Sequence, residues 1–173
     1  VKPNVYTINQ VLGAYSRDTE KEAPKRAEAL FETLDKFGAN NNGIQPDTVS
    51  FNTMMHIWSK QSNKSATTVQ NVDRLLQRMG ESYRSGYKDA KPDIITFNTA
   101  LNVYAKSREK GSAQRASDLL QRMEEDYSSG TSDVKPNTRS YNTVIDAWAK
   151  STSVCAPQRA EHILDRMAER YKS

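Results

Sequence analysis

Apolar residues recur along the chain with the spacing of an amphipathic α-helix. In four segments they fall at positions i, i+3, i+4 and i+7, which places them on one face of a helix. These segments are 27–34, 72–79, 116–123 and 160–167. Gly, Ser, Asn and Asp gather near residues 38–46, 84–92 and 128–136, which is typical of loops. The pattern predicts an all-helical chain with polar loops between its helices.

A second motif precedes each of these segments and recurs in the same register. It consists of Lys or Gln, a Pro-Asp or Pro-Asn step, then Thr or Ser, an aromatic residue or Ile, and Asn. The four copies span residues 2–9, 45–52, 91–98 and 135–142. The asparagines that close them, Asn9, Asn52, Asn98 and Asn142, are 43, 46 and 44 residues apart. Four matches in register exclude chance and identify an internal repeat.

Each repeat is predicted to hold two helices. The first begins after the Pro-Asp/Asn step, where the hydroxyl of Thr7, Ser50, Thr96 or Ser140 can cap free N–H groups. Pro24 and Pro157 suit the first turn of a second helix. Four helix–turn–helix units make an all-α fold of eight helices, an α-solenoid, in which each unit needs its neighbours to bury its apolar face. The repeats are expected at about 5–47, 48–93, 94–137 and 138–173, the last one truncated, within one domain, 1–173, cut from a longer array.

The first helix of each repeat has two faces of different chemistry. One face is apolar and is expected to pack in the core, its aromatic residues included. Its residues are Ile8, Val11, Leu12 and Tyr15, and then Phe51, Met54, Met55 and Trp58, Phe97, Ala100, Leu101 and Tyr104, and Tyr141, Val144, Ile145 and Trp148. On the opposite face, at about 100° per residue, Asn52 lies about 60° to one side of Val49 and Lys60 about 20° to the other. The equivalent triples are Tyr6, Asn9 and Arg17, Ile95, Asn98 and Lys106, and Arg139, Asn142 and Lys150.

Two interpretations of this polar face stand side by side. Asn is a poor helix former, so each copy lowers the stability of its helix a little unless the amide makes an interaction that compensates. The structural interpretation is that the Asn satisfies a local backbone group and that the cation complements the helix dipole. The functional interpretation is that the amide reads the edge of a base, the cation neutralises a phosphate, and the flat side chain before the Asn covers a base face.

Composition removes several other classes of protein. Leu, Ile, Val and Phe make up 17% of the 173 residues, which indicates either disorder or a thin core, and the repeat favours the thin core. One cysteine and two histidines exclude a disulfide framework and a multi-Cys zinc site, so no metal or other cofactor is expected. No apolar run is long enough to span a membrane, and no catalytic constellation is present, so the segment is expected not to be an enzyme. The net charge of +4 permits an acidic partner.

The recurring motif closely resembles the pentatricopeptide repeat family over nearly the whole chain. The resemblance implies a right-handed superhelix that binds single-stranded RNA, one base per repeat. It further implies that the base is chosen by the first-helix Asn together with the last residue of the same repeat. The pairs are Asn9 with Asp47, Asn52 with Asp93, and Asn98 with Asn137. In that family Asn with Asp favours U and Asn with Asn favours C over U, so the expected target is U-U-C/U-pyrimidine, 5′ to 3′ with the chain.

The same resemblance implies roles for the remaining site residues and a cellular compartment. Tyr6, Val49, Ile95 and Arg139 would sandwich bases, and Arg17, Lys60, Lys106 and Lys150 would approach phosphates. It implies a role in RNA processing, stability or translation in a mitochondrion or plastid, with no small-molecule ligand and no membrane contact. The repeats exceed the family's usual length, and the extra residues are expected in loops. The alternative is a protein-binding scaffold of the tetratricopeptide type, although Leu12, Met55, Leu101 and Ile145 stand where that family favours a small residue.

Overall fold

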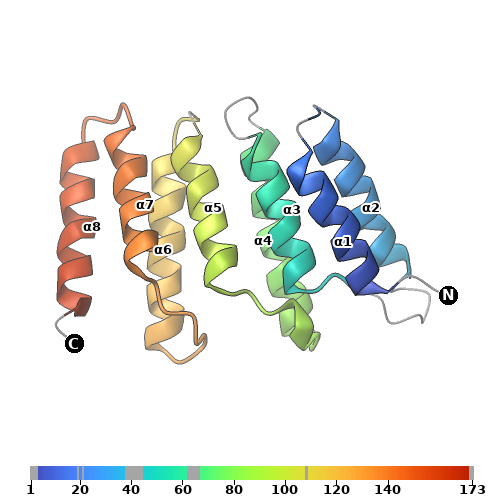
Figure 1. Cartoon of the computed structure of the whole chain (residues 1–173). Coiled ribbons are helices and arrows are strands. Elements are labelled where there is room, and N and C mark those ends of the chain that lie inside the picture. Colours follow the sequence, from blue (N-terminus) through green and yellow to red (C-terminus); the bar gives the residue numbers. More distant parts are fainter. Residues whose placement is uncertain are drawn as a thin grey trace.

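The structure is a computed structural model that describes residues 4–18, 20, 22–37, 45–61, 67–107 and 109–171. Within them the chain is helical and holds no β-strand (Figure 1). The α-helices are α1 (Val5–Arg17), α2 (Ala23–Phe37), α3 (Thr48–Ser59), α4 (Thr67–Arg84), α5 (Ile94–Lys106), α6 (Ser112–Ser128), α7 (Thr138–Ala149) and α8 (Ala156–Tyr171), with a short 3-10 helix η2 (Lys88–Ala90) after α4. This confirms the predicted all-α fold of four helical hairpins. The handedness of the superhelix stays a prediction.

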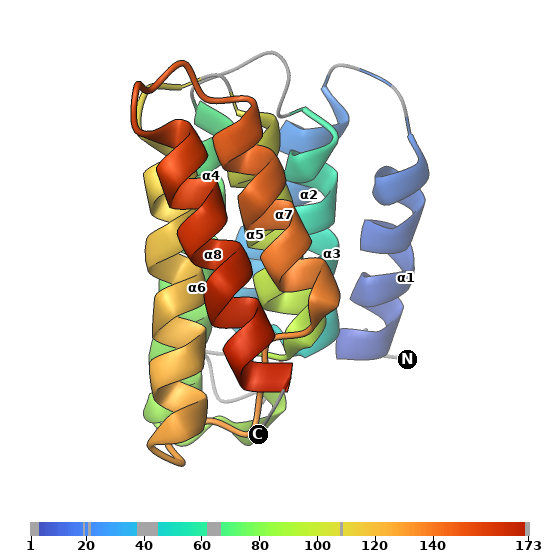
Figure 2. The same ribbon diagram turned by 90° about the vertical axis from the view of Figure 1, so that its left-hand side faces the viewer.

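The helices form two layers. The odd-numbered helices α1, α3, α5 and α7 lie side by side, each packed against the next (Figure 1). Each even-numbered helix packs against the helix before it and, in α2, α4 and α6, against the first helix of the following repeat. Figure 2 looks along the array from the α8 end and separates the two layers. Because every hairpin touches only its neighbours, the stability of the array depends on the junctions between repeats.

The first helices are capped by the residue after each proline. Asn4, Asp47, Asp93 and Asn137 are the N-caps of α1, α3, α5 and α7, and each side chain accepts the backbone N–H three residues on. In α3, α5 and α7 the backbone N–H of the N-cap donates in turn to the hydroxyl at that third position, which completes a capping box. The hydroxyls were predicted to be the caps, and the structure gives that role to the Asp or Asn before them. An acceptor with no proton of its own satisfies free N–H groups more directly.

Most of the predicted apolar face is buried, and Tyr15, Phe97 and Ile145 on it are half-buried. Leu12, Met54, Met55 and Leu101 are fully buried. Val11 does not follow this prediction and is 43% exposed, because no described helix covers the outer side of α1. Its equivalents Met54, Ala100 and Val144 are fully buried. The thin core therefore depends on neighbouring repeats rather than on each hairpin alone.

The segments between repeats pack on one another along one edge of the array. Thr48 Oγ1 donates to the carbonyl oxygens of Asp89 and Lys91, at 2.9 and 2.7 Å. Lys91 Nζ then pairs with Asp133 of the next such segment at 2.6 Å. The segments at 84–92 and 128–136, which lengthen these repeats, are thus held in place by contacts with their neighbours. The predicted loops at 38–46 and 61–66 lie for the most part outside the described residues.

Candidate nucleic-acid interface

The recurring asparagines of the first helices lie at the junctions between repeats. Asn9 Nδ2 donates to Asp47 Oδ1 at 3.1 Å and to Oδ2 at 3.3 Å. The equivalent bonds run from Asn52 to Asp93 at 3.1 Å and, more weakly, from Asn98 to Asn137 at 3.5 Å. The structure therefore brings together the two members of each predicted base-reading pair. The lengthened repeats leave each pair in direct contact.

A hydroxyl group holds the other end of each amide. Ser50 Oγ donates to Asn9 Oδ1 at 2.6 Å, and Ser50 belongs to the capping box of α3. Thr96 and Ser140 make the equivalent bonds to Asn52 and Asn98 at 2.7 and 2.8 Å. Each amide is thus fixed at both ends by the cap of the following helix. Sequence reasoning missed this contact, although a hydroxyl recurring three residues after each cap was a usable signal.

The asparagines therefore have a structural task that differs from the one considered above. The amide contacts the next repeat rather than a backbone group of its own helix. It still keeps one N–H and one carbonyl lone pair that these bonds do not use, since a primary amide carries two donors and two acceptor sites. Asn9 and Asn52 are half-buried, Asn98 is 8% exposed, and Asn142 is exposed on α7. The site is a row of recessed polar pairs.

Exposed side chains flank these pairs at regular intervals. Tyr6 is 68% exposed, Val49 56% and Ile95 60%, although each is large and apolar. Arg139 takes the same place on α7 and is exposed as well. Singly exposed apolar residues are ordinary, but a column that repeats once per hairpin is not. The column lies three residues before each asparagine, so every recessed pair has an apolar or planar side chain beside it.

Comparison with known proteins bears on the third repeat and the start of the fourth. Residues 86–151 match the family model of the pentatricopeptide repeat domain. This part of the chain is similar to that domain. The match covers α5, α6 and α7, with Ile95, Asn98, Asn137 and Asn142 inside it. A search of curated proteins found no match.

Pentatricopeptide repeats are in general RNA-binding helical repeats and are typically not enzymes. The motif that ends in Asn98 and Asn142 inside the matched residues also occurs before them, ending in Asn9 and Asn52. Within the described residues, no cluster of His, Cys, Asp or Glu is arranged to hold a metal ion. No helix in those same ranges is long and apolar enough to cross a membrane.

The recurring cations lie at the ends of the first helices, and their surroundings differ from one repeat to the next. Lys60 Nζ donates to the carbonyl oxygen of Ser16, at the end of α1. Lys150 pairs with Asp146, four residues before it, at 2.5 Å. Arg17 and Lys106 are exposed. Asp146 and Lys150 are four residues apart, which is the spacing of an ion pair within a helix, so this pair could have been predicted from the sequence. Of these four cations, Lys150 is thus the one whose charge is offset by a carboxylate in its own helix.

His56 lies among these cations on the polar face of α3. Partial burial and the charges of Lys60 and Lys106 lower the pKa of His56. The histidine is therefore neutral at pH 7, and it marks the place where the positive potential of two repeats combines. Sequence reasoning placed His56 on the polar face as a bystander or an RNA contact, but the proximity of Lys106, 50 residues away in the chain, needed the fold.

Proposed function

We propose that this chain binds single-stranded, pyrimidine-rich RNA along its first-helix face, one base per repeat. The observation that carries the proposal is the row of hydrogen-bonded pairs, Asn9–Asp47 and Asn52–Asp93 above all, each beside an exposed apolar side chain. We further propose, on family resemblance, that the binding serves RNA processing, stability or translation in a mitochondrion or plastid.

The chemistry of the pairs supports a pyrimidine target. An Asn–Asp pair offers one free N–H of the amide and a carboxylate oxygen, which complement the O4 or O2 acceptor and the N3–H donor of uracil. In the Asn98–Asn137 pair the second partner is a neutral amide, which can donate to N3 of cytosine instead. The proposed order is U-U-C/U-pyrimidine, 5′ to 3′ along the chain, with Asn142 reading the last base.

Two further groups complete the proposed contacts. Tyr6, Val49, Ile95 and Arg139 would each cover a base face, because apolar and planar side chains stack on any base. Arg17, Lys60, Lys106 and Lys150 would approach phosphates, which supply most of the affinity in a salt-dependent way. On this proposal Lys60 and Lys106 contribute most, since Lys150 already has Asp146 as a partner.

The substitution Asp93→Asn is expected to change the base preference of the second repeat from U to C. It turns the Asn52–Asp93 pair into the Asn–Asn pair of the third repeat. The helix cap survives, because Asn137 caps α7 in the same way. Selection from a randomised RNA pool at fixed salt measures the preference at each position. A discrimination change of about tenfold or more is expected from one bidentate base contact.

Asn52→Ala provides the matching loss of function and is expected to reduce selectivity at the same base. Asn71→Ala, on the second helix α4, is the control and should leave the selected sequence unchanged. The proposal is wrong if Asp93→Asn and the original chain select the same bases at every position. A chain without salt-sensitive RNA binding would instead be the protein-binding scaffold of the tetratricopeptide type.

RNA affinity is expected to rise as the pH falls from about 8 to about 5.5. In the free protein the pKa of His56 is lowered by burial, Lys60 and Lys106. Bound phosphate offsets that repulsion and raises the pKa, so binding takes up a proton and acid favours the complex. The folding stability of the free protein changes in the opposite direction. The unfolded chain binds the His56 proton more readily than the folded protein does, so acid lowers the free energy of unfolding. Titrations against His56→Gln measure the effect, and an identical pH profile for the two chains would contradict it.

A further inference from the structure

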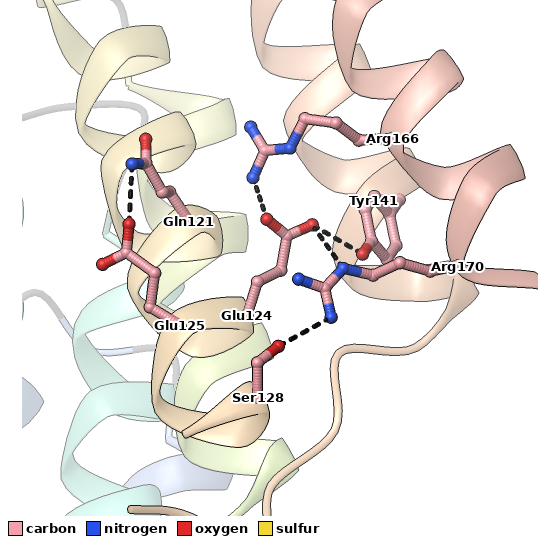
Figure 3. A network of polar contacts seen from close by, with 7 residues as sticks. All are labelled: Gln121, Glu124, Glu125, Ser128, Tyr141, Arg166 and Arg170. Atoms are coloured by element: carbon pink, nitrogen blue, oxygen red, sulfur yellow. Dashed lines mark hydrogen bonds and ion pairs between the residues drawn. The ribbon is translucent and has the colours of Figure 1, made fainter. Parts of the chain in front are cut away.

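The junction between the third and fourth repeats is held by a buried carboxylate. Glu124 on α6 is only 4% exposed. Its Oε1 accepts a hydrogen bond from the Tyr141 hydroxyl at 2.6 Å and lies 3.7 Å from Arg170 Nε. Its Oε2 accepts a charge-assisted bond from Arg166 (Figure 3). The carboxylate thus joins α6 to both helices of the next repeat.

The preceding junction lacks this carboxylate. In the register of the repeat, 44 residues earlier, Gly80 stands in place of Glu124 and Phe97 in place of Tyr141. The arginine remains, since Arg122 is the equivalent of Arg166. Gly80 lies inside α4, where glycine lowers helix stability, so helix stability does not explain the missing side chain. At this junction Arg122 keeps the place of Arg166, Asp126 stands in place of Arg170, and position 80 carries no carboxylate.

A cavity of about 500 Å³ occupies this place between the second and third repeats. Its charged lining consists of Arg84, Arg115 and Arg122 together with the carboxylates of Asp73 and Asp118, and its apolar lining includes Leu76, Pro92 and Phe97. A Cβ atom added to Gly80 would meet only the Arg84 guanidinium, at 3.9 Å. The wall therefore leaves room for a side chain at the position that Glu124 fills one repeat later.

The three arginines are only partly neutralised by their own neighbours. Arg115 pairs with Asp73 at 2.5 Å, whereas Arg122 reaches Asp126 only at 3.7 Å. Arg84 Nε donates to the Gly80 carbonyl oxygen at 3.1 Å, which satisfies a donor without cancelling the charge. Arg84 and Arg122 thus present guanidinium groups to whatever enters the cavity, beside its apolar lining, while Arg115 holds the Asp73 carboxylate.

We propose that this cavity binds a glutamate side chain from an acidic segment of a partner protein. The guanidinium fork matches a carboxylate, and the apolar wall of Leu76 and Phe97 matches the methylene groups that carry it. The junction between the third and fourth repeats provides the model for this contact, because there the chain places its own Glu124 between the equivalent helices. The site is formed mainly by α4 and α6 rather than by the first-helix face, so it leaves that face available to RNA.

The experiment measures the binding of a labelled oligoglutamate peptide to the whole chain, with an oligoglutamine peptide as the uncharged comparison. We expect the acidic peptide alone to bind. Gly80→Glu should weaken it about tenfold or more, because the installed carboxylate occupies the arginines. Arg122→Gln should weaken it as well. Gln70→Glu adds the same charge at an exposed place on α4 and should leave binding close to that of the original chain.

A second measurement is independent of the peptide. Gly80→Glu should raise the melting temperature more than Gly80→Gln does, because only the carboxylate pairs with Arg122. The proposal is overturned if the two variants melt alike and Gly80→Glu binds the peptide as tightly as the original chain. It is equally overturned if an oligouridine strand displaces the peptide while the Gly80 variants have no effect, since the peptide would then occupy the first-helix face.

Discussion

Glu124→Ala is expected to lower the free energy of unfolding by about 3 kcal/mol, the low end of the cost of breaking a buried ion pair. The substitution removes the acceptor of the Tyr141 hydroxyl and the partner of Arg166 and Arg170. Burial and the bond to Glu124 raise the pKa of Tyr141 far above its usual range, so that hydroxyl stays protonated and needs an acceptor. The arginines are 21% and 37% exposed, which lets water replace part of the interaction and keeps the loss at the low end.

Urea denaturation followed by circular dichroism measures this loss. The m-value should fall too, because a weakened junction lets the last hairpin unfold before the others. Glu125→Ala is the matched control: its carboxylate accepts only from Gln121, at 2.8 Å on the same exposed face (Figure 3), so a change of about 0.5 kcal/mol or less is expected. Equal losses for the two variants would show that the buried network does not hold the junction.

The double substitution Lys60→Glu and Lys106→Glu is expected to weaken RNA binding about a hundredfold at low salt, whatever the RNA sequence. Both lysines act on His56, so they stand close enough to create one positive region across two repeats. Losing two phosphate contacts on a single strand should also reduce the slope of log affinity against log salt by about 1.4. Base preference should be retained, because the Asn–Asp pairs are untouched.

The control for this experiment reverses the same number of charges elsewhere. Lys25→Glu with Arg159→Glu changes exposed positions on the second helices α2 and α8. Its binding should fall only slightly, through the change in net charge. If the control weakens RNA as much as the Lys60/Lys106 variant and with the same salt slope, the phosphates do not follow the first-helix face.

The helices and their register were predictable because they depend on neighbours in the chain. The i, i+3, i+4, i+7 spacing and the Pro-Asp/Asn step located all eight hairpin helices. The adjacency of Asn52 and Asp93 was also anticipated, although by family resemblance rather than by spacing. The cap was assigned to the wrong residue of the right motif, since a hydroxyl and a carboxylate three residues apart can both serve a helix start.

Contacts between repeats were beyond the sequence. The bond from Ser50 to Asn9, the approach of Lys106 to His56, and the carbonyl partner of Lys60 each join residues about one repeat apart. Helical periodicity orders residues within one helix, but it does not say which face of the next hairpin lies opposite. The sequence by itself thus determined the repeat, its helices and the recurring asparagines of the first helices. Only the tertiary structure decided that Lys60 contacts the end of α1, that each amide is fixed by the next cap, and that a cavity lies beside Gly80, because all three depend on how consecutive hairpins stack.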